Sequence, residues 1–362
     1  MKLKRKAFIL LVLLVFSFII HIYSVNAGRV ENGYSTRFFP AFAGFLRAIF
    51  GRLPFSFGDV LYGLLVAWLI WKLVKFARLM FKKAPAISKR EALLIASVNI
   101  LIFCSVIYVV FNLFWGINYN RKGIGWQIGI EKKKYSVDEL KQINMLLVEQ
   151  LNANKKILLD TRVVYPSNKK MFEMLDDAYR SASLNYPFLE YKPVSIKSSM
   201  WGWFGNYGGF TGYYNPFTAE AQVNTTVPKF LQPFIACHEV AHQLGYAKEM
   251  EANFVGYLAA SGSGNPLFKY SVYLDLFVYS YRNLFSIDSL SAKQYKQQLD
   301  SGVMADLKEW SDFNRRHSSI IEPVIRMFYG LYLRGNQQPE GVLSYDEVTG
   351  FIIAYYKKFG KI

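Results

Sequence analysis

The residues with the clearest chemical meaning in this sequence are His238, Glu239 and His242, whose flanks 235–237 and 243–244 are uncharged. On an α-helix the two imidazoles project from one face, with Cβ atoms about 6 Å apart, so one Zn²⁺ can take a nitrogen from each. Glu239 lies about 100° further around the helix, where it can reach a water on the metal without replacing it. The spacing therefore predicts a zinc site with Glu239 as general base, in preference to two surface histidines on an amphipathic helix.

A catalytic zinc ion usually has three protein ligands and leaves its fourth position to water. Glu249 and Glu251 begin the next predicted helix and, being two residues apart, point to different faces. Glu249 shares its face with Asn253, whose amide can orient a ligand. We therefore favour Glu249 as the third ligand and keep Glu251 as the alternative. Either carboxylate could instead interact with the dipole of the helix that it begins.

The zinc residues lie in a region, residues 121–362, whose pattern is that of a mainly helical α+β domain. Helices are predicted over about 233–244 and 249–260, which place the zinc motif and the third ligand on consecutive elements. Short β-like segments at 194–199 and 208–223 predict a small β-sheet just before the zinc helix. We therefore expect the site to be built from two helices beside a sheet.

The first part of the chain, residues 1–120, has a different character, because it contains three long apolar runs at about 7–25, 56–71 and 92–115. Each predicts a transmembrane helix, since about 20 apolar residues cross a bilayer. A cleaved signal peptide is the competing interpretation of the first run, because small residues follow it. Its apolar length favours a retained anchor.

Basic residues flank these runs and predict their orientation. Lysines and an arginine within residues 2–6 precede the first run, and a basic stretch, 72–90, joins the second run to the third. Both stretches should face the cytoplasm, which places the chain beyond about residue 116 outside it. Between the first two runs, the short apolar segment 38–47 is predicted to lie along the outer membrane interface, with a plain connecting loop as the alternative.

The overall composition excludes several classes of protein. The chain has 362 residues, 52% of them hydrophobic, a formal net charge of +17 and two cysteines. So much apolar surface excludes a disordered chain, and two cysteines give no disulfide framework. The excess positive charge is concentrated beside the apolar runs, so we expect a lipid bilayer and no nucleic acid as partner.

The zinc motif followed by Glu249-x-Glu251-Ala252-Asn253 resembles the gluzincins, the zinc metallopeptidases in which a second helix donates a glutamate ligand. The whole chain also resembles an uncharacterised bacterial family of three-span membrane proteins with an HExxH zincin-like domain. That resemblance rests on the zinc motif and three further segments: 53–59 (LPFSFGD), 115–119 (WGINY) and 214–224 (YNPFTAEAQVN). It implies a zincin-like peptidase domain and a Zn²⁺ cofactor.

Together these observations predict a membrane-anchored zinc metallopeptidase that hydrolyses peptide bonds with a zinc-activated water. We expect it in the bacterial plasma membrane, with a cytoplasmic N-terminus, an extracytoplasmic catalytic domain, periplasmic where an outer membrane exists, and a peptide or protein substrate in the cell envelope. The alternative is a non-enzymatic envelope protein, in which a structural or vestigial zinc site belongs to a domain that binds a partner.

Overall fold

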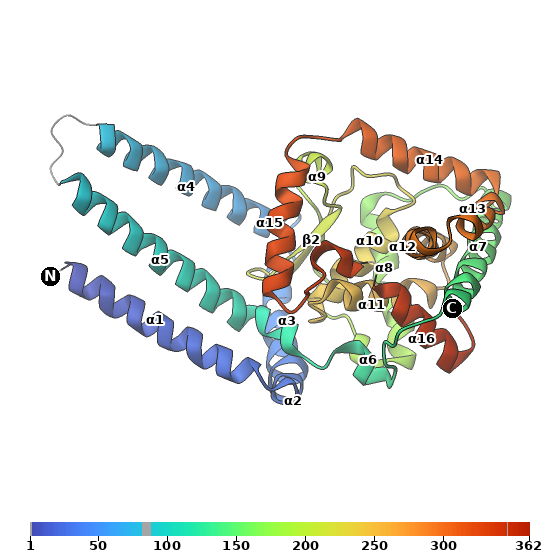
Figure 1. Ribbon diagram of the computed structural model, residues 1–362, viewed down its shortest axis with the longest axis horizontal. Coiled ribbons are helices and arrows are strands. Elements are labelled where there is room, and N and C mark those ends of the chain that lie inside the picture. Colours follow the sequence, from blue (N-terminus) through green and yellow to red (C-terminus); the bar gives the residue numbers. More distant parts are fainter. Residues whose placement is uncertain (1, 82–87, 346) are drawn as a thin grey trace.

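The computed structural model describes residues 2–81, 88–345 and 347–362. Three long N-terminal helices extend from one side of a mainly helical domain that contains a small β-sheet (Figure 1). The N-terminus lies at the far end of these helices, and the C-terminus lies within the domain. The predicted fold class, mainly helical α+β after three apolar helices, is confirmed at this level.

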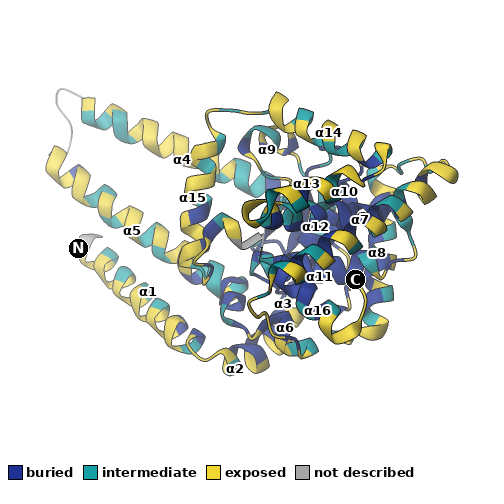
Figure 2. Ribbon diagram, turned by 45° about the vertical axis from the view of Figure 1, so that its right-hand side comes forward, coloured by how far each residue is buried: buried dark blue, intermediate teal, exposed yellow. Residues whose placement is uncertain are grey.

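The three long helices are α1 (Lys2–Ser24), α4 (Phe57–Phe81) and α5 (Lys89–Phe114). Their apolar spans contain 21, 25 and 26 residues. At about 1.5 Å per residue each is long enough to cross a hydrocarbon core of about 30 Å. Their side chains are largely exposed outside the domain, as the yellow and teal ribbons in Figure 2 show. Because such surface needs an apolar solvent, the protein is membrane-associated.

The second of these helices is longer than predicted, because it continues from residue 71 to Phe81. Lys72, Lys75 and Arg78 extend it, since long unbranched side chains favour helix and can reach water from near a membrane surface. Lys72 lies over the ring of Trp71, with its Nζ 5.1 Å from the ring centre. Lys82 and Lys83, which contribute to the predicted cytoplasmic connection, lie outside the described residues.

A helical segment between α1 and α4 joins the long helices to the domain. It comprises α2 (Ala27–Arg29), a π-helical stretch η1 (Val30–Phe38) and α3 (Phe39–Phe50). The loop alternative for residues 38–47 is therefore wrong, whereas their predicted place at a membrane interface stays a prediction. Arg47 of α3 is buried and donates hydrogen bonds to the backbone carbonyls of Lys192, Pro193 and Gln243, so α3 is fastened to the domain.

The domain contains most of the remaining helices. In chain order they are η2 (Gly116–Asn120), α6 (Gly123–Ile128), α7 (Val137–Asp160), α8 (Asn168–Asn185), η3 (Pro187–Leu189), α9 (Gly202–Gly208), α10 (Gln232–Gln243), α11 (Glu249–Ser261), α12 (Pro266–Ile287), α13 (Ser289–Gln297), α14 (Ser301–Arg316), α15 (Glu322–Gly335), η4 (Gly341–Tyr345) and α16 (Val348–Phe359). The helices α10 and α11 reproduce the predicted zinc helix and its successor to within one residue at each end. Their buried apolar side chains form one continuous core with α7, α8, α12 and α16.

The sheet has three short strands, β1 (Ile196–Ser198), β2 (Gly212–Asn215) and β3 (Glu220–Val223), in the order β1-β3-β2. β1 is parallel to β3, and β2 is antiparallel to it, with Tyr213 opposite Gln222. β2 is therefore an edge strand. The predicted sheet is confirmed, but helix α9 separates β1 from β2.

A second apolar cluster crosses the predicted domain boundary near residue 120. It includes Ile20 of α1, Val109 of α5, Trp115, Tyr214 of β2 and Ala247, which precedes α11. These contacts bury apolar surface from the domain-side ends of α1 and α5 against the sheet and the segment that precedes α11. The two parts of the chain are thus packed together at these ends.

A buried ion pair reinforces this junction. The Arg121 guanidinium donates to both carboxylate oxygens of Glu31, at 2.7 and 3.1 Å, and its third hydrogen bond goes to the Gly245 carbonyl at 3.2 Å. The side chains of Arg121 and Glu31 are 3% and 0% exposed. Removal of one partner would leave a charge without compensation in an apolar environment.

We expect Glu31→Gln to lower the free energy of unfolding by about 3 to 5 kcal/mol, because Arg121 would remain buried and unpaired. The measurement is a urea titration of the full-length chain in detergent micelles. The matched control is Asp312→Asn, which breaks the surface pairs with Lys308 and Arg315 and should cost no more than about 1 kcal/mol. Equal effects of the two substitutions would contradict the role given to the buried pair.

Candidate metal centre

The backbone brings the two predicted zinc helices together through a tight turn. Helix α10 ends at Gln243, and Gly245 follows in the left-handed conformation, with φ of +86°. A β-carbon at Gly245 would also lie 3.0 Å from the Phe39 ring. Only glycine combines this conformation with so close an approach at low cost. The turn sends α11 back along α10, so that Glu249 faces the histidines.

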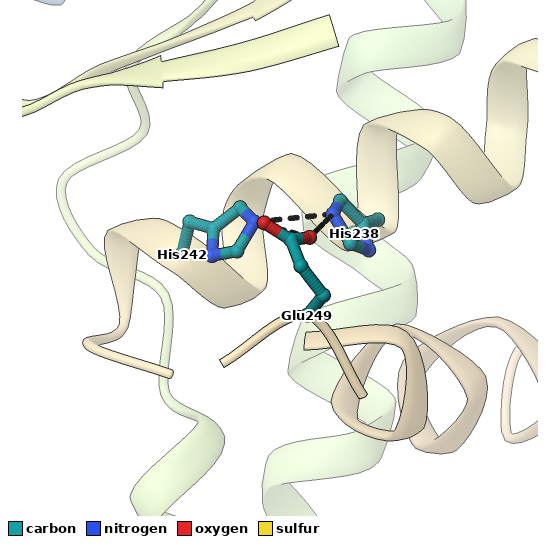
Figure 3. Close-up of side chains that lie close together, drawn as sticks. All are labelled: His238, His242 and Glu249. Atoms are coloured by element: carbon teal, nitrogen blue, oxygen red, sulfur yellow. Dashed lines mark hydrogen bonds and ion pairs between the residues drawn. The ribbon is translucent and has the colours of Figure 1, made fainter. Parts of the chain in front are cut away.

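Three buried side chains meet at one point (Figure 3). Glu249 Oε2 lies 3.2 Å from His238 Nε2 and 3.4 Å from His242 Nε2, and the two Nε2 atoms are 3.1 Å apart. In the part of the chain that the structure describes, this is the one group of three or more His, Cys, Asp or Glu side chains with ligand atoms so close together. The arrangement matches the number and types of protein ligands in a catalytic zinc site.

The hydrogen bonds of the other ring nitrogens fix the direction of the lone pairs. His242 Nδ1 lies 2.8 Å from the Tyr246 carbonyl, which can only accept, so Nδ1 carries the hydrogen. His238 Nδ1 is oriented in the same way by Asn253 Oδ1 at 2.7 Å. In the neutral rings both Nε2 lone pairs then point toward the Glu249 carboxylate. Three acceptors at this separation require a positive charge between them, and a metal ion satisfies all three, so the residues fit Zn²⁺.

The charges in the cluster shift one another's pKa. Burial lowers the pKa of His238, but its contacts with Glu249 and the charge of Glu239 outweigh this effect and raise it to about 9. Burial alone would raise the pKa of Glu249, yet the two imidazoles hold it well below its usual range. A proton on His238 therefore supplies the positive charge where no metal does, and metal binding competes with that proton.

Glu239 is buried on the side of α10 that faces the sheet. A β-carbon on Gly212 of the edge strand β2 would lie 2.5 Å from Glu239 Oε1 and 2.8 Å from its Cγ. Burial raises the pKa of Glu239 to about 7, although the two histidines oppose the shift. A carboxylate with its pKa near neutral pH is suited to accept and return a proton. Glycine at 212 is what lets the strand approach this carboxylate.

Two of the predicted site residues remain, Asn253 and Glu251, and only the first lies at the metal centre. Asn253 of α11 holds His238, as its predicted orienting role requires. Glu251 points away, because its carboxylate lies against the backbone at Gly123. Burial raises the pKa of Glu251, while the charges of Lys248 and Arg121 lower it. The structure thus brings Glu249, and not Glu251, to the two imidazoles.

Three contacts at the centre were missed by the sequence analysis. Tyr329 of α15 donates to Glu249 Oε1 at 2.6 Å. The side-chain oxygen of Gln338 accepts from the Glu249 backbone at 2.9 Å, and the Trp115 indole donates to the His242 carbonyl at 3.0 Å. These partners are 80 to 127 positions away along the chain, so no local spacing reveals them. Trp115 belongs to a segment that carried the family resemblance, which was the one available signal.

The fold and the cluster define a membrane-associated protein with a buried His-His-Glu group that can hold a metal ion. The chain belongs to the DUF3810 family, described as a protein of unknown function, whose model matches residues 34–353. No curated protein and no solved structure matches the chain. The geometry of the site is therefore the basis on which a function can be inferred.

We expect the purified full-length chain to bind about one zinc ion, measured by elemental analysis after equilibration with limiting zinc. His238→Ala, His242→Ala and Glu249→Gln should each abolish stoichiometric binding, because two ligands do not hold the ion. Glu251→Gln is the matched control, since it also neutralises a buried carboxylate at the start of α11 and should leave the zinc content unchanged. Loss of zinc from Glu251→Gln together with a full zinc content in Glu249→Gln would exclude this ligand set.

Proposed function

We propose that this protein is a membrane-anchored zinc metallopeptidase with a zincin-like domain of the gluzincin type. The observation that carries the proposal is the position of Glu249, whose carboxylate faces both imidazoles of the HExxH helix from the start of the next helix. An edge strand, β2, runs beside the general-base candidate Glu239. Two histidines of an HExxH helix and a glutamate from the next helix are the ligand set that the resemblance to gluzincins implies.

The proposed chemistry assigns a separate task to each group. Zinc, when bound, supplies polarisation of the scissile carbonyl and lowers the pKa of water toward about 7. Glu239 accepts the proton of the attacking water and passes it to the leaving amine, for which a pKa of about 7 is well placed. Asn253 and the Tyr246 carbonyl keep the imidazoles in orientation, and Tyr329 restrains the Glu249 carboxylate.

The proposal also includes a topology. Basic residues are concentrated at the start of α1, at the end of α4 and at the start of α5, which lie together at the end remote from the domain (Figure 1). By the positive-inside rule that end is cytoplasmic and the three helices span the membrane. The catalytic domain is then extracytoplasmic, and from the family resemblance we infer that the membrane is the bacterial plasma membrane. Its substrate is a peptide or protein of the cell envelope.

One observation favours a second candidate, a non-enzymatic envelope protein with a structural metal site. His238, Glu239, His242 and Glu249 are each no more than 8% exposed, so the centre is enclosed. A metal ion there would join α10 to α11 whether or not a substrate enters. The two candidate functions differ in the role of Glu239. The metallopeptidase needs it as general base, whereas the structural metal site does not require it.

We expect Glu239→Gln to keep zinc and the unfolding temperature of the parent but to abolish turnover, because glutamine cannot accept the proton. The measurement is mass spectrometry of new protein N-termini in membranes of cells that express the parent chain, Glu239→Gln or Glu251→Gln. Cleavage products should be present with the parent chain and with Glu251→Gln, and absent with Glu239→Gln. Identical N-termini in all three would favour the structural function.

Gly212→Ala tests whether the strand must approach Glu239. The added methyl group would overlap the Glu239 carboxylate and displace it, and a displacement of about 1 Å near the reacting atoms can lower turnover about 100-fold. Zinc content should stay at one ion per chain, because the three atoms nearest to the added carbon all belong to Glu239 and not to a ligand candidate. The readout is the rate at which the identified cleavage products form. An unchanged rate would show that Glu239 does not work from this position.

A further inference from the structure

Helix α15 stands between the metal centre and the membrane helices. Its inner face carries Gly330 and Leu333, which are buried, and Tyr329, which donates to the metal-ligand candidate Glu249. The Tyr332 ring packs edge-on against Phe111 in the last turn of α5, with ring centres 6.2 Å apart. α15 therefore contacts both the metal centre and the domain-side end of a membrane helix.

The outer face of α15 is an apolar stripe of four residues. Val324, Met327, Phe328 and Leu331 are 50%, 54%, 62% and 52% exposed. Their spacing of three and four residues places them on one face of the helix. Glu322, the one acidic residue in α15, lies about 160° from Val324 on the helix and so away from the stripe. Four large apolar side chains on one exposed face indicate an apolar partner.

The position of the stripe indicates which partner it meets. α15 crosses the domain-side ends of α4 and α5 and runs across their direction (Figure 1). Short α9 packs against α15, and Trp201, just before α9, contacts α4, where a β-carbon on Gly63 would lie 3.2 Å from its ring. Tryptophan is enriched at the interfaces between membrane and water. Helix α15, which carries the stripe, thus lies beside the domain-side ends of α4 and α5.

We propose that α15 lies along the domain-side surface of the bilayer, with the stripe of Val324, Met327, Phe328 and Leu331 inserted among the lipids. An amphipathic helix in this position lies in the membrane plane and buries its apolar face at the boundary between headgroups and acyl chains. The opposite face then reaches the metal centre through Tyr329. The lipid contact does not depend on whether the centre is catalytic.

The test uses the depth of spin labels on the full-length chain in vesicles of phosphatidylcholine and phosphatidylglycerol. Cys104→Ala removes the exposed cysteine, and Cys237 is buried and stays unlabelled. Separate variants then carry Phe328→Cys, Leu331→Cys or, as a control on the polar helix α14, Lys308→Cys. Collisions with oxygen, which concentrates in lipid, are compared with collisions with a water-soluble nickel complex.

We expect the ratio of oxygen to nickel collisions to be several-fold higher at both stripe positions than at Lys308. Each labelled variant must first show the parent's unfolding temperature. The collision ratios at the two stripe positions should also agree with each other. Nickel access at both positions equal to that at Lys308 would place the stripe in water and overturn the proposal. Protection from both reagents would overturn it as well, because it would indicate a cover made by a second copy of the chain.

Discussion

The convergence of three acceptor atoms on one buried point is the constraint on which the rest of the structure depends. Two imidazole lone pairs and a carboxylate oxygen within 3.4 Å of one another repel unless a positive charge compensates them. The surrounding structure must therefore hold them against that repulsion. It does so by a hydrogen bond at the outer atom of each group: His238 donates to Asn253, His242 donates to the Tyr246 carbonyl, and Glu249 accepts from Tyr329. The turn at Gly245 supplies the geometry that makes all three possible.

The membrane helices take part in this support. The Trp115 indole, directly after α5, holds the last turn of α10 through the His242 carbonyl. Glu220 of β3 accepts from the backbone of Phe57 at 3.2 Å and Gly58 at 2.7 Å, so its carboxylate caps the first turn of α4. Burial raises the pKa of Glu220, whereas these backbone hydrogen bonds lower it. The segments that carried the family resemblance, 53–59, 115–119 and 214–224, thus meet where the membrane helices join the sheet and the metal helix.

Local patterns in the sequence were enough for the parts of the site that depend on helix geometry. The spacing of His238 and His242, and the shared face of Glu249 and Asn253, follow from the helical repeat, and the structure places these side chains together. Contacts that depend on tertiary packing could not be predicted from such local patterns. Tyr329 reaches Glu249 from a helix 80 residues further along, and Gly212 meets Glu239 only because the sheet lies beside α10. The extension of α4 past residue 71 was missed because lysines were read as the end of an apolar run, although they favour helix.

Glu239 provides a physical reason to prefer the enzyme over the structural alternative. Its carboxylate is buried, and no described residue donates a hydrogen bond to Oε2. A buried polar group without a partner typically costs about 1 to 3 kcal/mol, and an apolar residue at this position would avoid that cost. A structural zinc site is normally closed by four protein ligands, whereas the described residues bring only His238, His242 and Glu249 together, as in a catalytic site. A hydrolase gains from Glu239, because a desolvated carboxylate with its pKa raised to about 7 binds and releases a proton most readily at neutral pH. The destabilising residue is therefore explained by the chemistry that it would perform.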